Sequence, residues 1–337
     1  MSAQAWSIVQ IGAQPSQSKR NVKARITLVT KRLSSSPEDI AKAVALLRAG
    51  ELLAFPTETV YGLGADACNG QAVASIYAAK GRPSFNPLIV HVADANIARD
   101  FGEWSETAQL LGDSFWPGPL SLVLPLRPDT GLSELVTAGL DSVAIRVPAG
   151  DLARNLLSAF GGPIAAPSAN PSGKISPTTP EHVLAGLDGK VSAVLDGGPC
   201  AVGLESTIIG LVGAPTLLRA GGVPSEAIEK VLGGSLAVAG KAITAPGQLA
   251  SHYAPSANVR LNAKSWEAGE LTLGFGQMEC DLNLSETADL VEAAANLFGH
   301  LHKLDAMDGD RIAVAEIPQT GLGAAINDRL KRAAAPR

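Results

Sequence analysis

Hydrophobic residues recur at helical spacing after Ser36. The stretch Ser36-Pro37-Glu38-Asp39 supplies a side-chain N-cap, a proline at the first helical position and two acids in the first turn. Ile40, Val44 and Leu47 then lie on one face, and Gly50 is the kind of residue that commonly ends a helix. The pattern predicts an amphipathic helix between Ser36 and Gly50.

Short aliphatic runs alternate with helical patterns along the segment that follows. Strands are predicted at 52–55, 87–92, 120–124, 142–147, 164–166, 193–195, 206–211 and 216–218. Helices are predicted at 71–80, 106–111, 151–159, 181–185 and 226–232. The turns between them are too irregular for a doubly wound sheet, so we expect a single α/β domain over residues 26–233.

Residues 234–256 have the composition of a linker, because they are rich in Gly, Ala, Ser and Pro and show no clear period. Beyond them, strands are predicted at 258–261, 271–275 and 312–317, and helices at 286–301 and from Leu322 onward. This β-β-α-β-α order predicts a small α/β domain with parallel strands over residues 257–337.

Composition limits the classes of function. The 337 residues fit two domains of roughly 150 residues each. A net charge of −5 argues against a general nucleic-acid or membrane-surface binder, so any such contact would be weak or indirect. Three widely spaced cysteines lack zinc-ligand spacing and indicate a reducing compartment. Since no apolar run reaches the ~18 residues of a membrane helix, we expect a cytoplasmic protein.

The N-terminus differs from the rest of the chain. The first 37 residues contain six cations and no acid, with several Ser and Gln. A transit peptide has this bias, but no clear amphipathic stripe is present, which favours a disordered extension over residues 1–25.

Familiar phosphate-binding motifs are missing from the sequence. Gly173-Lys174 lacks the upstream glycine and following hydroxyl of a P-loop. Gly62-Leu63-Gly64 and Gly321-Leu322-Gly323 lack the third glycine of a dinucleotide fingerprint. A nucleotide-binding function would therefore need another kind of phosphate site.

Five segments carry many polar residues at the ends of predicted strands. They are residues 55–64, 80–91, 142–148, 165–173 with Ser176, and 205–209 with 218–222. Taken one at a time, a surface turn or a helix cap accounts for them about as well as a ligand site does. Together they place hydroxyls, small residues and four cations in one domain: Lys80, Arg82, Arg146 and Arg219. Such a set suits a polyanion together with a small zwitterion.

Two of these residues are notable for their strand positions. Period two places Val143 and Ile145 on one face and Arg146 on the other, and a mid-strand arginine needs an anionic partner. That partner is either a neighbouring Asp or Glu, or the carboxylate or phosphate of a substrate. His91 shares a face with Ile89, and a strand histidine is more often a hydrogen-bonded core residue than a ligand contact.

In order and content, the five segments resemble the signature of the threonylcarbamoyl-AMP synthase family, which has the YrdC-like fold. The resemblance covers residues 35–232, and the linker resembles that of the long, two-domain form through His252-Tyr253-Ala254-Pro255. It implies a twisted α/β sheet around a large basic cavity, with a smaller C-terminal α/β, Rossmann-like domain.

The resemblance also implies which residues bind the substrates. Threonine would be held by Thr59, His91, Arg146 and Ser206. ATP would be held by Arg82, Asn86, Ser142, Ser168, Asn170, Ser176, Arg219 and Tyr253. Lys80 and Arg82 would be the catalytic cations that neutralise the triphosphate.

The implied reaction is that of a nucleotidyltransferase. It joins ATP, L-threonine and bicarbonate into L-threonylcarbamoyladenylate and pyrophosphate, for the threonylcarbamoyladenosine modification of tRNA. Mg²⁺ would be the cofactor, held mainly by phosphate oxygens without metal ligands from the chain. A tRNA threonylcarbamoyl transferase would receive the product.

Two alternatives share the implied fold, a carbamoyl-adenylate-forming enzyme and an RNA-binding module. The scattered cysteines argue against the zinc-finger region that accompanies the first, and the net charge of −5 argues against the second. Threonine-dependent turnover of ATP would separate all three functions.

The linker is itself a candidate functional element. It is longer than the roughly 2–8 residues that connect neighbouring elements, and an aromatic hydroxyl next to a proline would be wasted in a free coil. We predict that residues 234–256 fold over the cavity as a lid with Tyr253 at the nucleotide, so that water is excluded. The second domain would anchor this lid without supplying catalytic groups.

Overall fold

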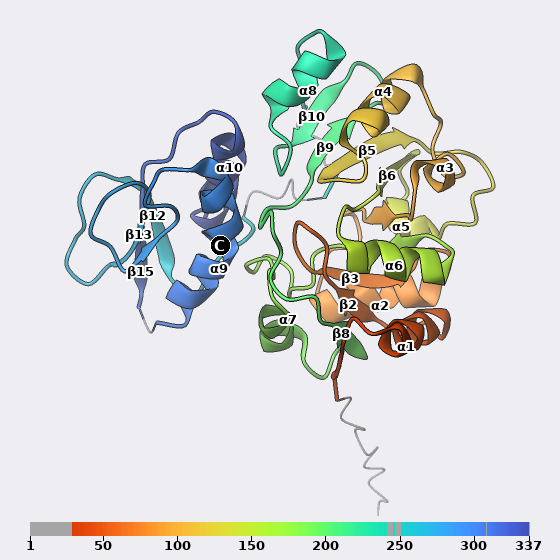
Figure 1. The fold of residues 1–337 in the computed structure, drawn as a ribbon, viewed down its shortest axis with the longest axis horizontal. Coiled ribbons are helices and arrows are strands. Elements are labelled where there is room, and N and C mark those ends of the chain that lie inside the picture. The colour runs from red at the N-terminus through yellow and green to blue at the C-terminus, as the bar shows by residue number, and fades with distance from the viewer. Residues whose placement is uncertain (1–28, 241–244, 247–250, 308, 337) are drawn as a thin grey trace, which may run out of the picture.

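The computed structural model describes residues 29–240, 245–246, 251–307 and 309–336, and the predicted extension at 1–25 lies outside them. Figure 1 shows a larger part built around a sheet and flanked by helices, with a smaller α/β part beside it. Within the described residues, each helix is too short or too polar to span a bilayer.

A mixed sheet organises the larger part. Within the described residues, eleven strands lie in the order β1-β8-β2-β3-β7-β4-β6-β5-β9-β10-β11. Their bounds are β1 Lys31–Leu33, β2 Leu53–Phe55, β3 Gly62–Asp66, β4 Ile89–His91, β5 Leu120–Pro125, β6 Ser142–Arg146, β7 Ile164–Ala165, β8 Ala193–Leu195, β9 Thr207–Gly210, β10 Thr216–Arg219 and β11 Ala237–Val238. Parallel pairs such as β4–β6 occur beside antiparallel pairs such as β5–β6, so the sheet is not doubly wound.

Helices flank this sheet, and most of them lie where hydrophobic periodicity predicts a helix. They are α1 Pro37–Arg48, α2 Gly70–Lys80, α3 Ala95–Ala98, α4 Glu106–Phe115, α5 Glu134–Thr137, α6 Asp151–Phe160, α7 Pro180–Leu187 and α8 Ser225–Leu232. The predicted cap of α1 is confirmed, since the Ser36 side chain accepts a hydrogen bond from the Asp39 N–H. Sequence reasoning missed β1, β11, α3 and α5, which are two to four residues long and too short to carry a period.

The glycine-rich stretch Gly62-Leu63-Gly64 is a strand, so the surface turn that could account for segment 55–64 does not include these glycines. It forms β3, antiparallel to β2. A Cβ atom on Gly64 would lie 2.8 Å from the Phe55 ring and 3.0 Å from the Ile164 side chain. Glycine is therefore needed here for close packing between neighbouring strands rather than for a turn.

Alternation along β4 and β6 separates the two faces of the sheet, as predicted. Val90 and Ile145 belong to the largest hydrophobic core, whereas Ile89 and Ala144 pack on the opposite face. His91 and Arg146 share that opposite face, at the ends of two parallel strands, and are register partners. The strand period thus places two candidate site residues side by side.

The smaller part is an α/β unit with parallel strands, as predicted. In the described residues its strands lie in the order β12-β15-β13-β14, and each pair is parallel. The elements are β12 Asn258–Ala263, β13 Leu271–Gly274, β14 Leu282–Asn283, α9 Leu290–Asp305, β15 Arg311–Ala315 and α10 Leu322–Ala333. Figure 1 shows α9 and α10 on the side of this unit that faces the larger part.

The two parts share a hydrophobic core. Val60, Ile175 and Leu204 of the larger part pack in one cluster with side chains of α9 and α10. Gly203 approaches α9 so closely that a Cβ atom on it would lie 2.5 Å from the Ala294 carbonyl oxygen. Because Val60 and Leu204 lie within or beside the predicted site segments, the second part packs directly against the candidate site.

Candidate active site

The five polar segments predicted from the sequence converge on one cavity. Each contributes at least one lining residue. Of the predicted site residues, the cavity is lined by Thr59, Arg82, His91, Arg146, Ser168, Ser206, Arg219 and Tyr253. The structure thus brings together all four candidate threonine contacts and half of the candidate ATP contacts.

Lys80 lies beneath the cavity wall rather than in its lining. Its ammonium group donates to the backbone carbonyls of Ser168 and Asn170, each at 2.5 Å. Burial, together with the nearby positive charge of Arg82, holds its pKa well below the usual value. In this arrangement Lys80 secures the loop that carries Ser168, and its predicted contact with a triphosphate remains a prediction.

Four other predicted ATP contacts lie outside the lining. Ser142 begins β6, four residues ahead of Arg146, and is half-buried. The Asn170 amide donates to the carbonyls of Pro171 and Lys174. Asn86 is fully buried, and neither polar atom of its side chain has a hydrogen-bond partner within the described residues. The fourth, Ser176, donates to a glutamate considered below.

Arg146 is buried at the end of β6, and its guanidinium is directed by three contacts. Nε donates to the Gly118 carbonyl at 3.2 Å, and one terminal nitrogen donates to Thr59 Oγ1 at 2.9 Å. The other terminal nitrogen lies 2.7 Å from a carboxylate oxygen of Glu58. A neighbouring carboxylate, one of the two partners left open by the sequence, therefore pairs with Arg146. The guanidinium also lines the cavity, and its pairing with a substrate anion stays a prediction.

His91 is a buried, neutral imidazole. Burial and the positive charge of Arg146 lower its pKa to about 3. Its Nδ1 has no hydrogen-bond partner within the described residues, although the ring lines the cavity. An unpartnered polar atom on a residue that lines a cavity favours a ligand contact over the core role that a lone strand histidine suggests.

Two further arginines give the cavity its positive charge. Arg82 donates to the carbonyls of Asn86 and Pro87, and burial is the main cause that lowers its pKa to about 10, so it stays protonated at neutral pH. Arg219 donates to the Ser206 carbonyl at 2.9 Å and to Ser206 Oγ at 3.1 Å. Both side chains are held by neutral oxygens, which leaves their charge available to an anion.

Sequence reasoning missed two glutamates at the site, the buried Glu205 and the largely buried Glu58, whose side chain is 11% exposed. Burial acts to raise the pKa of Glu58, but pairing with Arg146 outweighs it and lowers that pKa. Glu205 lines the cavity and has its pKa lowered to about 2, because the arginines near it outweigh burial. Both glutamates lie within the five polar segments, and that position could have marked them as candidates. Their arginine partners could not be identified, because they are distant in the sequence.

The linker reaches the cavity at its C-terminal end. Pro246, His252 and Tyr253 line the cavity, and Tyr253 is only 1% exposed. Its ring packs edge-on against the His252 ring at 4.0 Å and tilted against Phe298 of α9 at 5.5 Å. Tyr253 also has a left-handed backbone with φ of 61°, which a non-glycine residue adopts only when its surroundings require it.

The cavity is basic but small. Its open volume is about 50 Å³, whereas pockets for nucleotide-sized ligands are on the order of 300–1,000 Å³. The expected large cavity is thus not open in this arrangement, because linker side chains help to fill it.

This geometry defines the class of site. Three arginines, a neutral histidine and several hydroxyls line one cavity, which suits an anionic nucleotide together with a small zwitterion. Two family models match the chain, one described as "Telomere recombination" over residues 45–221 and one as "Threonylcarbamoyl-AMP synthase, C-terminal domain" over residues 223–335. The chain belongs to the threonylcarbamoyl-AMP synthase family.

Relatives from two organisms support this assignment over nearly the whole chain. It is 44% identical to a threonylcarbamoyl-AMP synthase of Bacillus subtilis (strain 168), with 92% of this chain and 96% of the relative covered. It is 42% identical to the Pyrococcus abyssi protein of the same name, with 88% and 94% covered. Both domains are therefore part of the family resemblance.

Solved structures agree with the fold. The crystal structure of P. abyssi Sua5 complexed with L-threonine matches with a TM-score of 0.84 at 38% identity, covering 91% of this chain and 97% of that one. E. coli YciO matches with a TM-score of 0.52 at 21% identity, covering 57% and 95%, which shows only a common fold. The twisted α/β sheet and the second α/β domain predicted from the sequence are confirmed.

Proposed function

We propose that this chain forms L-threonylcarbamoyladenylate and pyrophosphate from ATP, L-threonine and bicarbonate, as a nucleotidyltransferase. The observation that carries the proposal is the convergence of Arg82, Arg146 and Arg219 with the neutral His91 on one cavity. Family membership supports an enzyme that makes this adenylate. The product would serve the threonylcarbamoyladenosine modification of tRNA.

Threonine would bind around Arg146. The hydrogen bonds to Gly118 and Thr59 use two of its five N–H groups. The terminal nitrogen that forms the ion pair with Glu58 has no hydrogen-bond partner within the described residues, so it can donate to a carboxylate. His91 offers a neutral nitrogen to the ammonium or hydroxyl group of the amino acid, and Ser206 Oγ lies on the same lining. The relative from P. abyssi was crystallised with L-threonine, which supports this ligand.

ATP would bind towards Arg82 and Arg219. The threonine amine would be carboxylated by bicarbonate with loss of water, and a carbamate oxygen would then attack the α-phosphorus. The bond from the α-phosphorus to the bridging oxygen breaks, and pyrophosphate leaves with that electron pair. The chain would act by holding reactants together and by offsetting charge on the phosphates, without a covalent intermediate on a side chain.

Mg²⁺ would enter with the nucleotide. Within the described residues there is no cluster of three or more His, Cys, Asp or Glu side chains that could hold a metal ion. Glu58 and Glu205 are both engaged in ion pairs with arginines. This fits an ion held by phosphate oxygens, where it would supply further neutralisation of the triphosphate.

The fate of the product follows from its chemistry. A mixed anhydride of a carbamate and a phosphate is prone to hydrolysis, so it needs a closed site and prompt transfer. We expect a tRNA threonylcarbamoyl transferase in the cytoplasm to receive it. The net charge of −5 supports weak or indirect contact of this chain with tRNA itself.

Pyrophosphate release tests the reaction. In full-length protein, pyrophosphate is expected to appear only when ATP, threonine and bicarbonate are all present, and leaving out any one should abolish it. The coupled measurement should detect pyrophosphate rather than orthophosphate as the first product. Threonine-independent release would favour a carbamoyl-adenylate-forming enzyme instead, and orthophosphate as the primary product would rule out the proposed reaction.

A further inference from the structure

Glu205 is a carboxylate in a cavity that is otherwise suited to anions. It is 6% exposed, lines the cavity, and follows directly on Leu204 of the core shared by the two domains. One oxygen accepts a hydrogen bond from Ser176 Oγ at 2.5 Å, and the other lies 2.8 Å from Nε of Arg329. A negative charge here would oppose a triphosphate unless it is neutralised.

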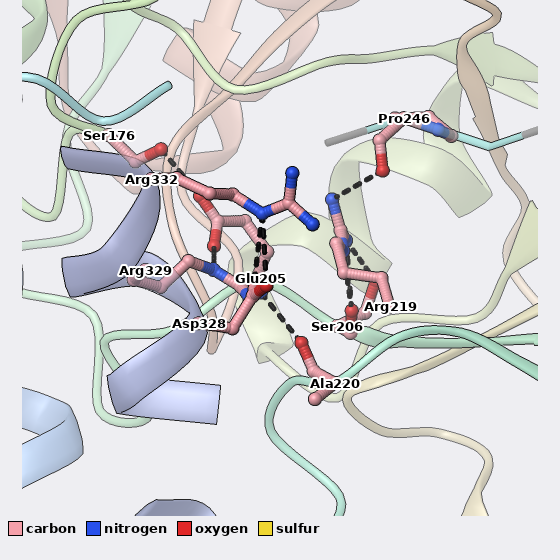
Figure 2. A network of polar contacts seen from close by, with 9 residues as sticks. All are labelled: Ser176, Glu205, Ser206, Arg219, Ala220, Pro246, Asp328, Arg329 and Arg332. Carbon is pink, nitrogen blue, oxygen red and sulfur yellow. Dashed lines mark hydrogen bonds and ion pairs between the residues drawn. The ribbon is translucent and has the colours of Figure 1, made fainter. Parts of the chain in front are cut away.

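Arg329 reaches this carboxylate from the second domain. It lies on α10, 124 residues from Glu205 in the chain, and is fully buried. Figure 2 shows its guanidinium between Glu205, Asp328 and the Ala220 carbonyl, and the distances to Asp328 and Ala220 are 2.8 and 2.9 Å. Helix α10 therefore brings a charged side chain against Glu205 of the cavity lining.

The same guanidinium also contacts the linker. Its central carbon lies 5.2 Å from the centre of the Tyr253 ring, within the range of a cation–π contact. One turn along α10, the Arg332 carbonyl accepts a hydrogen bond from the His252 N–H at 3.2 Å. Arg329 thus joins the cavity wall, the linker and the second domain.

The pairing of Glu205 decides whether Arg219 is available to a ligand. Arg219 lies next to Glu205 in the cavity lining, but its guanidinium donates to Ser206 and to the Pro246 carbonyl. Arg219 bonds to Ser206, the residue after Glu205, and after Arg329 it is the second arginine whose charge lowers the pKa of Glu205. Without Arg329, a pair between Glu205 and Arg219 would remove a cation from the anion site. A buried carboxylate does not remain unpaired when a guanidinium is within reach.

We propose that Arg329 is a positioning residue of the nucleotide site. By neutralising Glu205 it leaves Arg219 free to bind phosphate, and by packing against Tyr253 it holds the linker residues at the cavity. The proposed role of Arg329 rests on one part of the proposed function, namely that ATP binds in this cavity. The second domain supplies no catalytic group, but it supplies the charge that makes the cavity receptive to ATP.

The test compares ATP and threonine binding to full-length variants by calorimetry, each ligand alone. Arg329→Met is expected to weaken ATP binding about 10-fold or more, because Glu205 then competes for Arg219. Threonine binding, centred on Arg146, should change much less. Lys331→Met, which removes a cation from the exposed face of the same helix, is the matched control and should leave both affinities unchanged.

Rescue separates this role from a merely structural one. Arg329→Met combined with Glu205→Gln removes both charges while keeping an acceptor for Ser176, so it should recover most of the lost ATP affinity. Arg329→Lys keeps the charge and should bind ATP more tightly than Arg329→Met. Equal losses of ATP and threonine binding, without rescue by Glu205→Gln, would show that Arg329 only holds the domains together.

Two further outcomes keep the test decisive. If Arg329→Met does not fold, the double variant is measured in its place, because it leaves no buried charge unpaired. ATP binding more than about 10-fold weaker than wild type in the folded double variant would overturn the proposal. Should wild type bind ATP but release no pyrophosphate with threonine and bicarbonate, the proposed reaction would fail while the comparison of ATP affinities still tests Arg329.

Discussion

Arg146→Lys is expected to weaken threonine binding by about 2–5 kcal/mol, while ATP binding changes much less. A lysine cannot reproduce the planar fork, and its single nitrogen cannot contact Gly118, Thr59 and Glu58 and also receive a carboxylate. Glu58 would lose the partner that offsets its burial. The measurement is threonine affinity by calorimetry, alongside the KM for threonine in pyrophosphate release.

A matched control removes the effect of a general Arg-to-Lys change. Arg154→Lys alters an exposed arginine on α6 and should leave threonine affinity and stability unchanged. If Arg146→Lys retained wild-type threonine affinity, Arg146 would pair with Glu58 alone and the carboxylate site would lie elsewhere. Thermal unfolding of each variant would show how much stability is lost when the ion pair between Arg146 and Glu58 is weakened.

Tyr253→Ala is expected to lower the yield of adenylate per ATP consumed by about 10-fold, with the fold retained. The ring lines the cavity and packs against His252, Phe298 and Arg329, so its removal leaves a space that admits water to the carbamate and the adenylate. Loss of a buried aromatic ring also costs about 3–5 kcal/mol of stability. Product yield and ATP consumption should therefore be measured together, below the unfolding temperature.

Tyr253→Phe is the control, because it keeps the ring and should retain most of the yield. Truncation after Gly234 tests the same lid but is less clean, because it exposes Val60 and Leu204 and leaves Glu205 without Arg329. Wild-type yield from Tyr253→Ala would show that the linker is only a tether.

The chemistry of the site could be predicted where it depends on local sequence. The period of β6 separates Arg146 from Val143 and Ile145, because successive side chains on a strand point to opposite faces. The same rule puts His91 beside Ile89 on the cavity face. The five polar segments could also be recognised, since their small and hydroxyl-bearing residues lie at the ends of predicted strands.

Only the tertiary structure decided how these charges are paired. Neither Glu58 with Arg146 nor Glu205 with Arg329 is visible in a local pattern, because each pair joins elements far apart in the chain. By its residue type Gly64 suggests a turn, but it lies in a strand where the Phe55 ring of the neighbouring strand leaves no room for a Cβ atom. Sequence periodicity reports which face a side chain occupies; which distant side chain meets it there depends on how the strands and the two domains pack together.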